Sequence, residues 1–303
     1  MLGIASGVPS QKQPTAVKFT RPSLFLTPYL LGALFLIALP AGISIYIAFT
    51  RYNGIAAPVF VGWENFQFLQ LEPLARVALT NSIIFVTQSV PLRVLGALGL
   101  ALFFNQPRRG TGFYRAAVAL PTVIPEAAYA LAWTWILNPL YGPFNAILRS
   151  LGFAPPAWFA DSDSAMLGLV IASLFPLGEG FIILLAGLRH IPREIYDAAR
   201  VDGANRFQIL ASITLPLLAP WLALFAIRDV VMSFQNTFTL AFITTRGGPY
   251  YATVFPTQLI YEFAFSRMDF GAAAAVMLLV FLVTSALVLL VYFLFADDAF
   301  NEA

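Results

Sequence analysis

The side chains most able to do chemistry are ionisable groups embedded in long apolar stretches. Glu126, Glu179, Arg228 and Asp229 each interrupt a run of aliphatic and aromatic residues. Ionisable groups inside a membrane are costly and mark a polar cavity or an ion pair between helices. A carboxylate in a cavity can accept hydrogen bonds from ligand hydroxyl groups. We expect the acids to line a cavity. The alternative is that Arg228 and Asp229 form an ion pair between helices. Arg93 can snorkel or pair structurally.

Groups needed for other chemistries are scarce. The chain has no cysteine, and therefore no disulfide, thiolate nucleophile or cysteine metal site. Histidine occurs only as His190 and lysine only as Lys12 and Lys18. Neither lysine follows a glycine, which excludes the Gly-Lys-Ser/Thr sequence of a Walker A phosphate-binding loop. We expect no catalytic or metal site on this chain, and any ATP chemistry must lie on another chain. The net charge of +2 gives no sign of nucleic-acid binding.

The composition predicts an all-α membrane protein. Hydrophobic residues make up 59% of the chain and charged residues 11%, too few polar side chains to cover a soluble protein of this size. A helix needs about 20 apolar residues to cross the hydrocarbon core. Six stretches qualify: residues 24–49, 79–104, 114–137, 166–188, 213–243 and 271–295. The first is too long for a signal peptide. The fifth exceeds one crossing and is expected to be tilted, broken or extended.

The distribution of basic residues orients these spans. With the N-terminus inside, ten basic residues fall in the cytoplasm: Lys12, Lys18, Arg21, Arg108, Arg109, Arg115, Arg189, Arg193, Arg200 and Arg206. Five fall outside: Arg51, Arg76, Arg149, Arg246 and Arg267. This bias predicts that both termini are cytoplasmic. We therefore expect a cytoplasmic tail at 1–23, a six-helix transmembrane domain at 24–295 and a second cytoplasmic tail at 296–303.

Two external segments are expected to be ordered. Phe60, Trp63, Phe66 and Leu69 recur at helical spacing, which indicates a short helix at the membrane surface. Such a helix is either an aromatic membrane anchor or a docking surface for an external partner. The same two alternatives hold for the loop from Pro139 to Trp158.

The loop at 189–212, between the fourth and fifth spans, has the features of a stiff projecting helix. Pro192 suits a first helical position, and Glu194 and Asp197 place negative charge near the positive end of the helix dipole. Gly203 can adopt the left-handed conformation that stops the helix. A second short helix would then run into the fifth span. One face carries small residues at three- and four-residue spacing, which would let another protein approach closely; it consists of Ile195, Ala198, Ala199 and Asp202.

This loop resembles the EAA loop of binding-protein-dependent ABC import permeases. That pattern is Glu-Ala-Ala, three residues, Gly, nine residues and Ile-x-Leu-Pro, and Asp197 stands here for the usual glutamate. The matching residues are Asp197, Ala198, Ala199, Gly203, Ile213, Leu215 and Pro216. The resemblance implies the type I ABC importer permease fold. It also implies ATPase-coupling roles for Glu194, Asp197, Ala198, Ala199, Asp202 and Gly203.

Further motifs look like those of carbohydrate-importer permeases, most of all the larger permease of the maltose system and the glycerol-phosphate permease. They are Phe60–Phe66, Leu120-Pro121 with Pro125, and Arg246-Gly-Gly-Pro249. The resemblance implies a heterodimer with a second permease, two copies of a cytoplasmic ATPase and an extracytoplasmic sugar-binding protein in a prokaryotic plasma membrane. This chain would bind no cofactor itself, since ATP and Mg belong to the ATPase.

The same resemblance places the sugar contacts. They would be Thr122, Glu126, Phe175, Glu179, Asp229, Ser233 and Asn236. The last three lie at four- and three-residue spacing, on one helical face. Gln235 could take over if that helix is locally broken, and these polar groups could instead bind one another between helices. A secondary solute transporter is the alternative function, since acids in spans and discontinuous helices also serve proton coupling, but it does not explain the EAA-like loop.

Overall fold

The computed structural model describes residues 22–106 and 109–299. The chain forms two compact parts, one ending at Ser44 and one beginning at Ile45. The described residues of the first part are helical and include α1 (Pro22–Ala33), the π-helical turn η1 (Leu34–Ala38) and the start of α2 (Leu39–Ala48). The predicted tail at 1–23 lies outside the described residues except for its last two, which begin α1.

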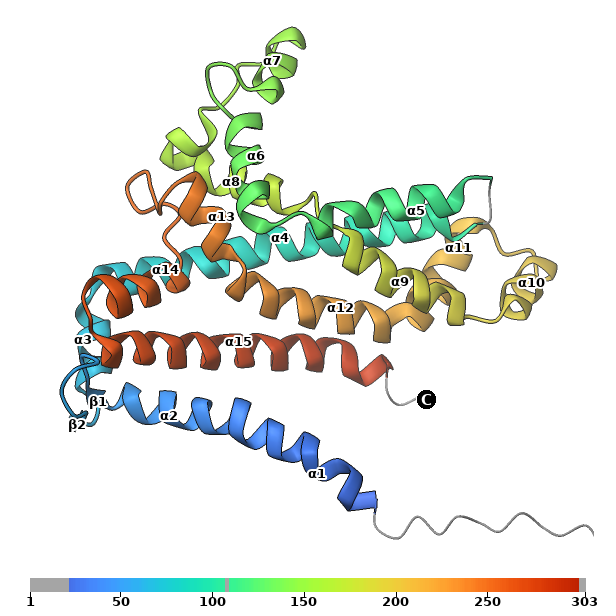
Figure 1. The fold of residues 1–303 in the computed structure, drawn as a ribbon. Helices are drawn as coiled ribbons and strands as arrows, with labels where there is room; N and C mark the ends of the chain where they lie inside the picture. The colour runs from blue at the N-terminus through green and yellow to red at the C-terminus, as the bar shows by residue number, and fades with distance from the viewer. Residues whose placement is uncertain (1–21, 107–108, 300–303) are drawn as a thin grey trace, which may run out of the picture. The chain divides into compact units, whose positions relative to one another are not determined.

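The second part is helical apart from one short strand pair (Figure 1). Its elements before the third span are β1 (Thr50–Arg51), β2 (Val59–Phe60), α3 (Glu64–Leu71) and α4 (Pro73–Asn105). The third and fourth spans and the loop between them hold α5 (Thr111–Ala119), η2 (Leu120–Val123), α6 (Glu126–Ile136), α7 (Pro143–Ser150), η3 (Trp158–Ala160), α8 (Ser162–Ser173) and α9 (Gly178–His190). The remaining elements are α10 (Arg193–Val201), α11 (Arg206–Ile209), η4 (Leu210–Thr214), α12 (Leu215–Gln235), α13 (Thr237–Thr244), α14 (Pro256–Tyr261), η5 (Glu262–Ser266) and α15 (Phe270–Ala299).

Four helices are long and apolar enough to cross a membrane by themselves, and two bent helix pairs bring the number to six among the described residues. The single helices cover Leu26–Ala48, Pro73–Asn105, Arg206–Gln235 and Phe270–Phe293. The bent pairs are Thr111–Val123 with Glu126–Ile136, and Ser162–Ser173 with Gly178–His190. The six predicted stretches therefore correspond to the six observed spans, and the chain is a multi-pass membrane protein.

Three spans are broken. The third bends by 98° and the fourth by 48°. Pro125 lacks an N–H donor and disfavours helical backbone in the residue before it, and Pro176 does the same in the fourth span. The fifth stretch, expected to be tilted, broken or extended, ends its long helix before Asn236 and resumes as α13, so it is broken.

The predicted surface helix is α3, and it is shorter than expected. Phe60 pairs with Thr50 in an antiparallel strand pair, so the fold is not wholly α-helical. Trp63 caps the N-terminus of α3, and Phe66 and Leu69 lie within it. The Phe49 ring meets Trp63 edge-on and lies tilted against Phe66, with 5.1 and 5.2 Å between ring centroids. The aromatic residues thus hold the strand pair and α3 together.

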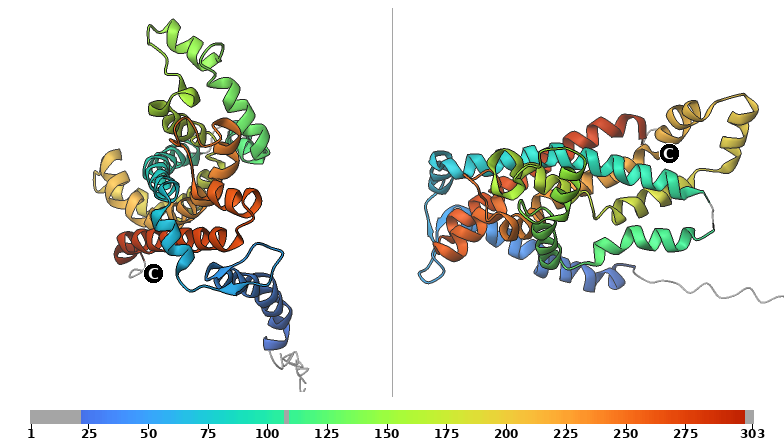
Figure 2. Two further views of the ribbon diagram at one scale, coloured as in Figure 1. Left: turned by 90° about the vertical axis from the view of Figure 1, so that its left-hand side faces the viewer. Right: turned by 90° about the horizontal axis from the view of Figure 1, so that it is seen from above.

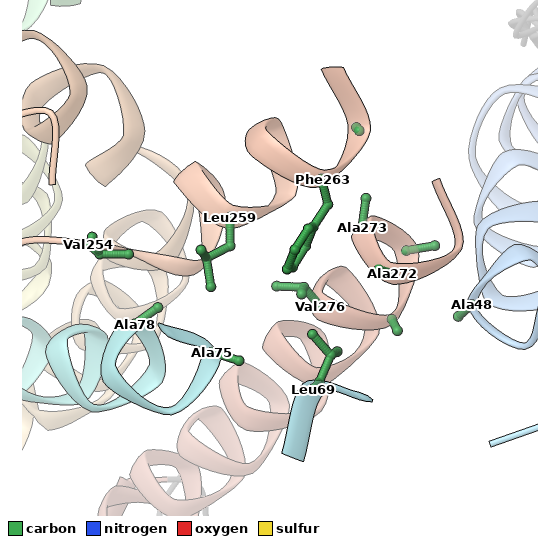
Figure 3. Packing of buried hydrophobic residues seen from close by; sticks show 13 residues of the cluster. Ala48, Leu69, Ala75, Ala78, Val254, Leu259, Phe263, Ala272, Ala273 and Val276 are labelled. Carbon is green, nitrogen blue, oxygen red and sulfur yellow. The ribbon is translucent and has the colours of Figure 1, made fainter. Parts of the chain in front are cut away.

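Small residues allow the helices of the second part to approach closely. Ala272, Ala273 and Val276 of α15 form a core with residues of α3, α4 and α14, and Phe263 of η5 points its ring toward them (Figure 3). Helices α4, α9, α12 and α15 pack along one another (Figures 1 and 2). The α10–α11 loop lies at the end of these helices where α15 finishes, and α3 and α14 lie at the opposite end.

The predicted tail at 296–303 is partly helical, because α15 continues to Ala299.

Candidate functional site

The three helix breaks meet around one cavity of about 550 Å³. The first turns of α6, α9 and α13 all contribute to its lining, and α4 and α12 complete it. The chain leaves the helical path at Ile124 and Pro125 in the third span, between Leu174 and Leu177 in the fourth, and at Asn236 in the fifth. Irregular backbone within a membrane is tolerated where it lines a cavity or is covered by protein. The breaks therefore mark this cavity as the candidate site.

Six of the seven predicted sugar contacts line the cavity. They are Thr122, Glu126, Glu179, Asp229, Ser233 and Asn236. Helical spacing places Asp229 and Ser233 one turn apart on α12, and Asn236 follows at its C-terminal cap. The structure thus brings together residues from three broken spans. Their role in binding a substrate remains a prediction.

Phe175 does not line the cavity. Its position was assigned by resemblance, counting from the EAA-like loop, and the chain between α8 and α9 is a turn in which the Leu177 N–H donates to the Phe175 carbonyl at 2.9 Å. The Phe175 side chain is 55% exposed. Its ring stacks on Tyr129, with 6.4 Å between centroids, and meets Trp133 edge-on. Tyr129, rather than Phe175, is the member of this aromatic group that reaches the cavity.

A buried ion pair joins α4 to α12 in the cavity wall. Arg93 Nε lies 2.9 Å from Asp229 Oδ2, and the two side chains are only 14% and 8% exposed. The Arg93 guanidinium also donates to the hydroxyls of Ser233 and of Ser89, the latter at 3.2 Å. Attraction between buried charges offsets their desolvation only when further hydrogen bonds satisfy the remaining groups. Ser89 and Ser233 supply those bonds.

A second ion pair joins α9 to α12. Arg228 contacts Glu179, and their side chains are 32% and 53% exposed. Glu179 and Asp229 therefore line the cavity and also bind arginines of other helices, Glu179 binding Arg228 and Asp229 binding Arg93. Arg93 pairs structurally and does not snorkel.

Among the other lining residues, three that were not predicted as contacts can offer polar or apolar surface to a ligand. Tyr129 follows Glu126 by three positions on α6, so helical spacing could have found it. Thr237 begins α13 beside Asn236, and its buried hydroxyl has no hydrogen-bond partner in the part of the chain that the structure describes. Met232 lies one position before Ser233 on α12 and adds an apolar surface. No signal in the sequence singles out Thr237 or Met232.

The second candidate region is the loop that contains α10 and α11. Pro192 is the N-terminal cap of α10, so the helix starts at Arg193, one residue later than predicted. Gly203 has a φ of +81° and stops the helix as expected, because a glycine meets no steric penalty in this conformation. Asn205 and Gln208 form a capping box at the start of α11, with hydrogen bonds of 2.8–3.0 Å. The loop then enters α12 through the π-helical turn η4.

The predicted coupling residues divide by exposure. Five are exposed: Glu194, Asp197, Ala198, Asp202 and Gly203. Ala199 is buried, so its side chain supports the loop from within. Its backbone carbonyl accepts a hydrogen bond from the Ala204 N–H at 2.9 Å. Asp197 and Arg200 form an exposed ion pair at 2.7 Å, of a kind that contributes little to stability. The exposed side of α10 is therefore open to contact by another protein.

Helices α9 and α12 connect the loop to the cavity. Each begins or ends at the loop and carries a cavity residue at the other end, Glu179 on α9 and Asp229 on α12. A Cβ added at Gly180 would lie 2.2 Å from the Phe225 ring, and one added at Gly187 would lie 2.5 Å from the Trp221 ring. Because the two glycines have no side chain, the aromatic rings of α12 fit against them, and α9 and α12 pack closely together.

Comparison with known proteins places this arrangement among transport proteins. Residues 78–298 match the family described as binding-protein-dependent transport system inner membrane component. Over 274 residues the chain is 33% identical to the probable ABC transporter permease protein YesP of Bacillus subtilis, covering 89% of this chain and 88% of that protein. Over 260 residues it is 32% identical to the trehalose/maltose transport system permease protein MalF of Thermococcus litoralis, covering 85% and 88%.

A solved structure shares the fold. A chain of the bacterial alginate ABC transporter, solved in complex with a periplasmic protein that holds an alginate pentasaccharide, superposes with a TM-score of 0.75 at 21% identity. The match covers 88% of the present chain and 91% of that chain.

Proposed function

The chain belongs to the family of binding-protein-dependent transport system inner membrane components, and on that premise we propose that it forms half of the pathway of an ATP-driven sugar importer. Its partners are a second permease, two copies of a cytoplasmic ATPase and an extracytoplasmic sugar-binding protein. The complex lies in the plasma (inner) membrane of a prokaryote with both termini of this chain inside. The permease itself catalyses no bond chemistry and binds no cofactor, because ATP and Mg belong to the ATPase.

One observation supports this proposal most strongly: α9 and α12 tie the exposed α10 helix to the polar cavity. From Glu179 to His190, α9 spans about 16 Å at 1.5 Å per residue. Ring-into-glycine contacts and the Arg228–Glu179 pair hold α9 against α12 over this distance. A displacement of α10 therefore moves both helices together and reaches the cavity wall.

The mechanism follows from this connection of α10 to the cavity through α9 and α12. Closure of the ATPase pair displaces α10, and α9 and α12 pass that displacement to the residues around the helix breaks. The cavity then opens to the external side, receives sugar from the binding protein and closes again after hydrolysis. Hydroxyl, amide and carboxylate groups of the cavity hydrogen-bond the sugar hydroxyls, and Tyr129 offers an apolar face for the sugar ring.

The proposal is tested by reconstituting the chain in proteoliposomes with its partner permease, ATPase and binding protein. We expect sugar to accumulate only when ATP and the binding protein are both supplied, on opposite sides of the membrane. The secondary-transporter alternative predicts accumulation driven by an ion gradient in vesicles that contain this chain and no ATPase. Accumulation without ATPase would overturn the proposal.

Family membership leaves the charge of the sugar open. Trehalose and maltose, named for one relative, are uncharged, whereas the structure that shares the fold belongs to an importer of the acidic polysaccharide alginate.

A further inference from the structure

The cavity offers no uncommitted cation among its described residues. Arg93 and Arg228 are the only basic side chains in the lining. Arg93 is bound to Asp229, and Arg228 is bound to Glu179. A guanidinium has five N–H donors, so a ligand could still reach those that the ion pair leaves free. An anionic ligand bound there would lie beside the carboxylate that already balances the charge, and like charges repel.

The positive ends of two helices are also neutralised. The N-terminal turns of α6 and α9 line the cavity, and such helix ends ordinarily favour anions. Glu126 lies in the first turn of α6 and Glu179 in the first turn of α9. Glu126 forms no ion pair within the described part of the chain, so its charge faces the cavity uncompensated. These two carboxylates occupy the positions that a ligand phosphate, sulfonate or uronate would need.

Uncharged hydrogen-bonding groups are, in contrast, available. The Thr122 hydroxyl donates to the Ala119 carbonyl at 2.7 Å and keeps its lone pairs for a ligand, whereas the Ser233 hydroxyl also accepts from Arg93. Thr237 is 5% exposed, and its hydroxyl makes no hydrogen bond to any described residue. A buried hydroxyl without a partner is costly, and a ligand hydroxyl would remove that cost. Gln235 and Asn236 add amide donors and acceptors at the same break.

We propose, building on the sugar-importer function, that this half of the cavity selects uncharged glycans and rejects anionic ones. The paired arginines organise the wall and do not bind the substrate. The substrate is held by hydroxyl and amide groups, and Glu126 and Glu179 exclude ligands that carry a carboxylate, sulfonate or phosphate. Selection by charge at the membrane cavity is thus a property of this chain, separate from any selection by the binding protein.

The test compares two glycan pools that differ only in charge. Partial hydrolysates of starch, mannan and galactan form the neutral pool. The acidic pool is the same material after oxidation of its primary hydroxyls to carboxylates. Each pool is dialysed against the purified permease–ATPase complex without binding protein, and mass spectrometry measures the glycans retained. We expect the neutral pool to be retained about tenfold or more over the acidic pool, since losing a hydrogen bond to a charged group has an effect of this size.

Two variants assign the selectivity to this cavity. Glu179→Gln frees Arg228, and Glu126→Gln removes the unpaired carboxylate without breaking an ion pair. Each should reduce the preference for the neutral pool about tenfold. Glu262→Gln is the matched control, because it breaks the ion pair with Arg267 outside the cavity and should leave the preference unchanged.

The outcomes separate this inference from the proposed function. Equal or greater retention of the acidic pool by the unmodified complex overturns the inference but leaves the sugar importer intact. A neutral preference that neither cavity variant changes also overturns it, because the selection then lies elsewhere. Failure to retain either pool, together with no sugar accumulation in the full reconstituted system, overturns the proposed function itself.

Discussion

Arg93 Nε and Asp229 Oδ2 lie 2.9 Å apart, and this contact ties the second span to the fifth in the wall of the cavity. Both side chains are buried, so each charge depends on the other for its stability. The relationship makes Asp229 a structural member of the site as well as a lining residue. A substitution at Asp229 therefore tests packing and transport together, and needs a partner substitution to be interpreted.

Removing one member of this pair should destabilise the protein more than removing both. Arg93→Leu or Asp229→Leu leaves a buried charge without its partner, which costs about 3–5 kcal/mol. The Arg93→Leu/Asp229→Leu double variant should recover part of that loss. Thermal unfolding of the purified protein in detergent measures the three stabilities. The exposed Glu262–Arg267 pair is the control, since its removal should cost only about 0–1 kcal/mol. A double variant as unstable as the sum of the singles would contradict the pairing.

The contact between α9 and α12 should tolerate no side chain at its glycines. Gly187→Val would place carbon atoms against the Trp221 ring and force the helices apart, at a cost of about 1–3 kcal/mol. Gly180→Val should do the same against Phe225. Gly99→Val on α4 is the control, because a Cβ there meets nothing within 4 Å. Unfolding temperature and transport-coupled ATP hydrolysis should both fall in the first two variants. Normal coupling in either of them would show that α9 and α12 need not move as one body.

Chemical labelling can establish the orientation of the bundle. The natural chain has no cysteine, so single cysteines can be added directly. Four highly exposed positions suit the experiment: Ile55 and Tyr250 near one end of the long helices, and Val201 and Phe207 at the other. In intact cells a membrane-impermeant maleimide should label the first two and not the last two. All four should react after the membrane is permeabilised, which controls for accessibility. External labelling at Val201 would reverse the proposed topology.

The sequence predicts the spans and the loop because both signals are local. Six apolar stretches are long enough to cross a bilayer, and the helix stop at Gly203 depends on one glycine. The breaks are harder to predict. Pro91 and Pro220 lie inside continuous helices, whereas Pro125 and Pro176 lie at sharp bends. Proline alone does not distinguish the two cases, because neighbouring helices can satisfy the backbone groups that it frees.

The ion pairs depend on tertiary structure. Nothing local indicates that Arg93 meets Asp229 or that Arg228 meets Glu179, because each pair joins helices that are separate in the chain. The position of Phe175 outside the cavity lining also depends on tertiary structure, because the turn between α8 and α9 lies between Phe175 and Glu179.

The central claim is that α10 couples a cytoplasmic ATPase to the cavity, and substitution of Ala198 tests it most directly. Ala198 is exposed on α10, so Ala198→Trp should leave the permease folded and assembled while it prevents close contact with the ATPase. Ala56→Trp, in the exposed segment between β1 and β2 at the other end of the bundle, is the matched control. The measurement is sugar-stimulated ATP hydrolysis by the reconstituted complex. We predict that stimulation is lost in Ala198→Trp and retained in Ala56→Trp; full stimulation in Ala198→Trp would contradict the coupling role of α10.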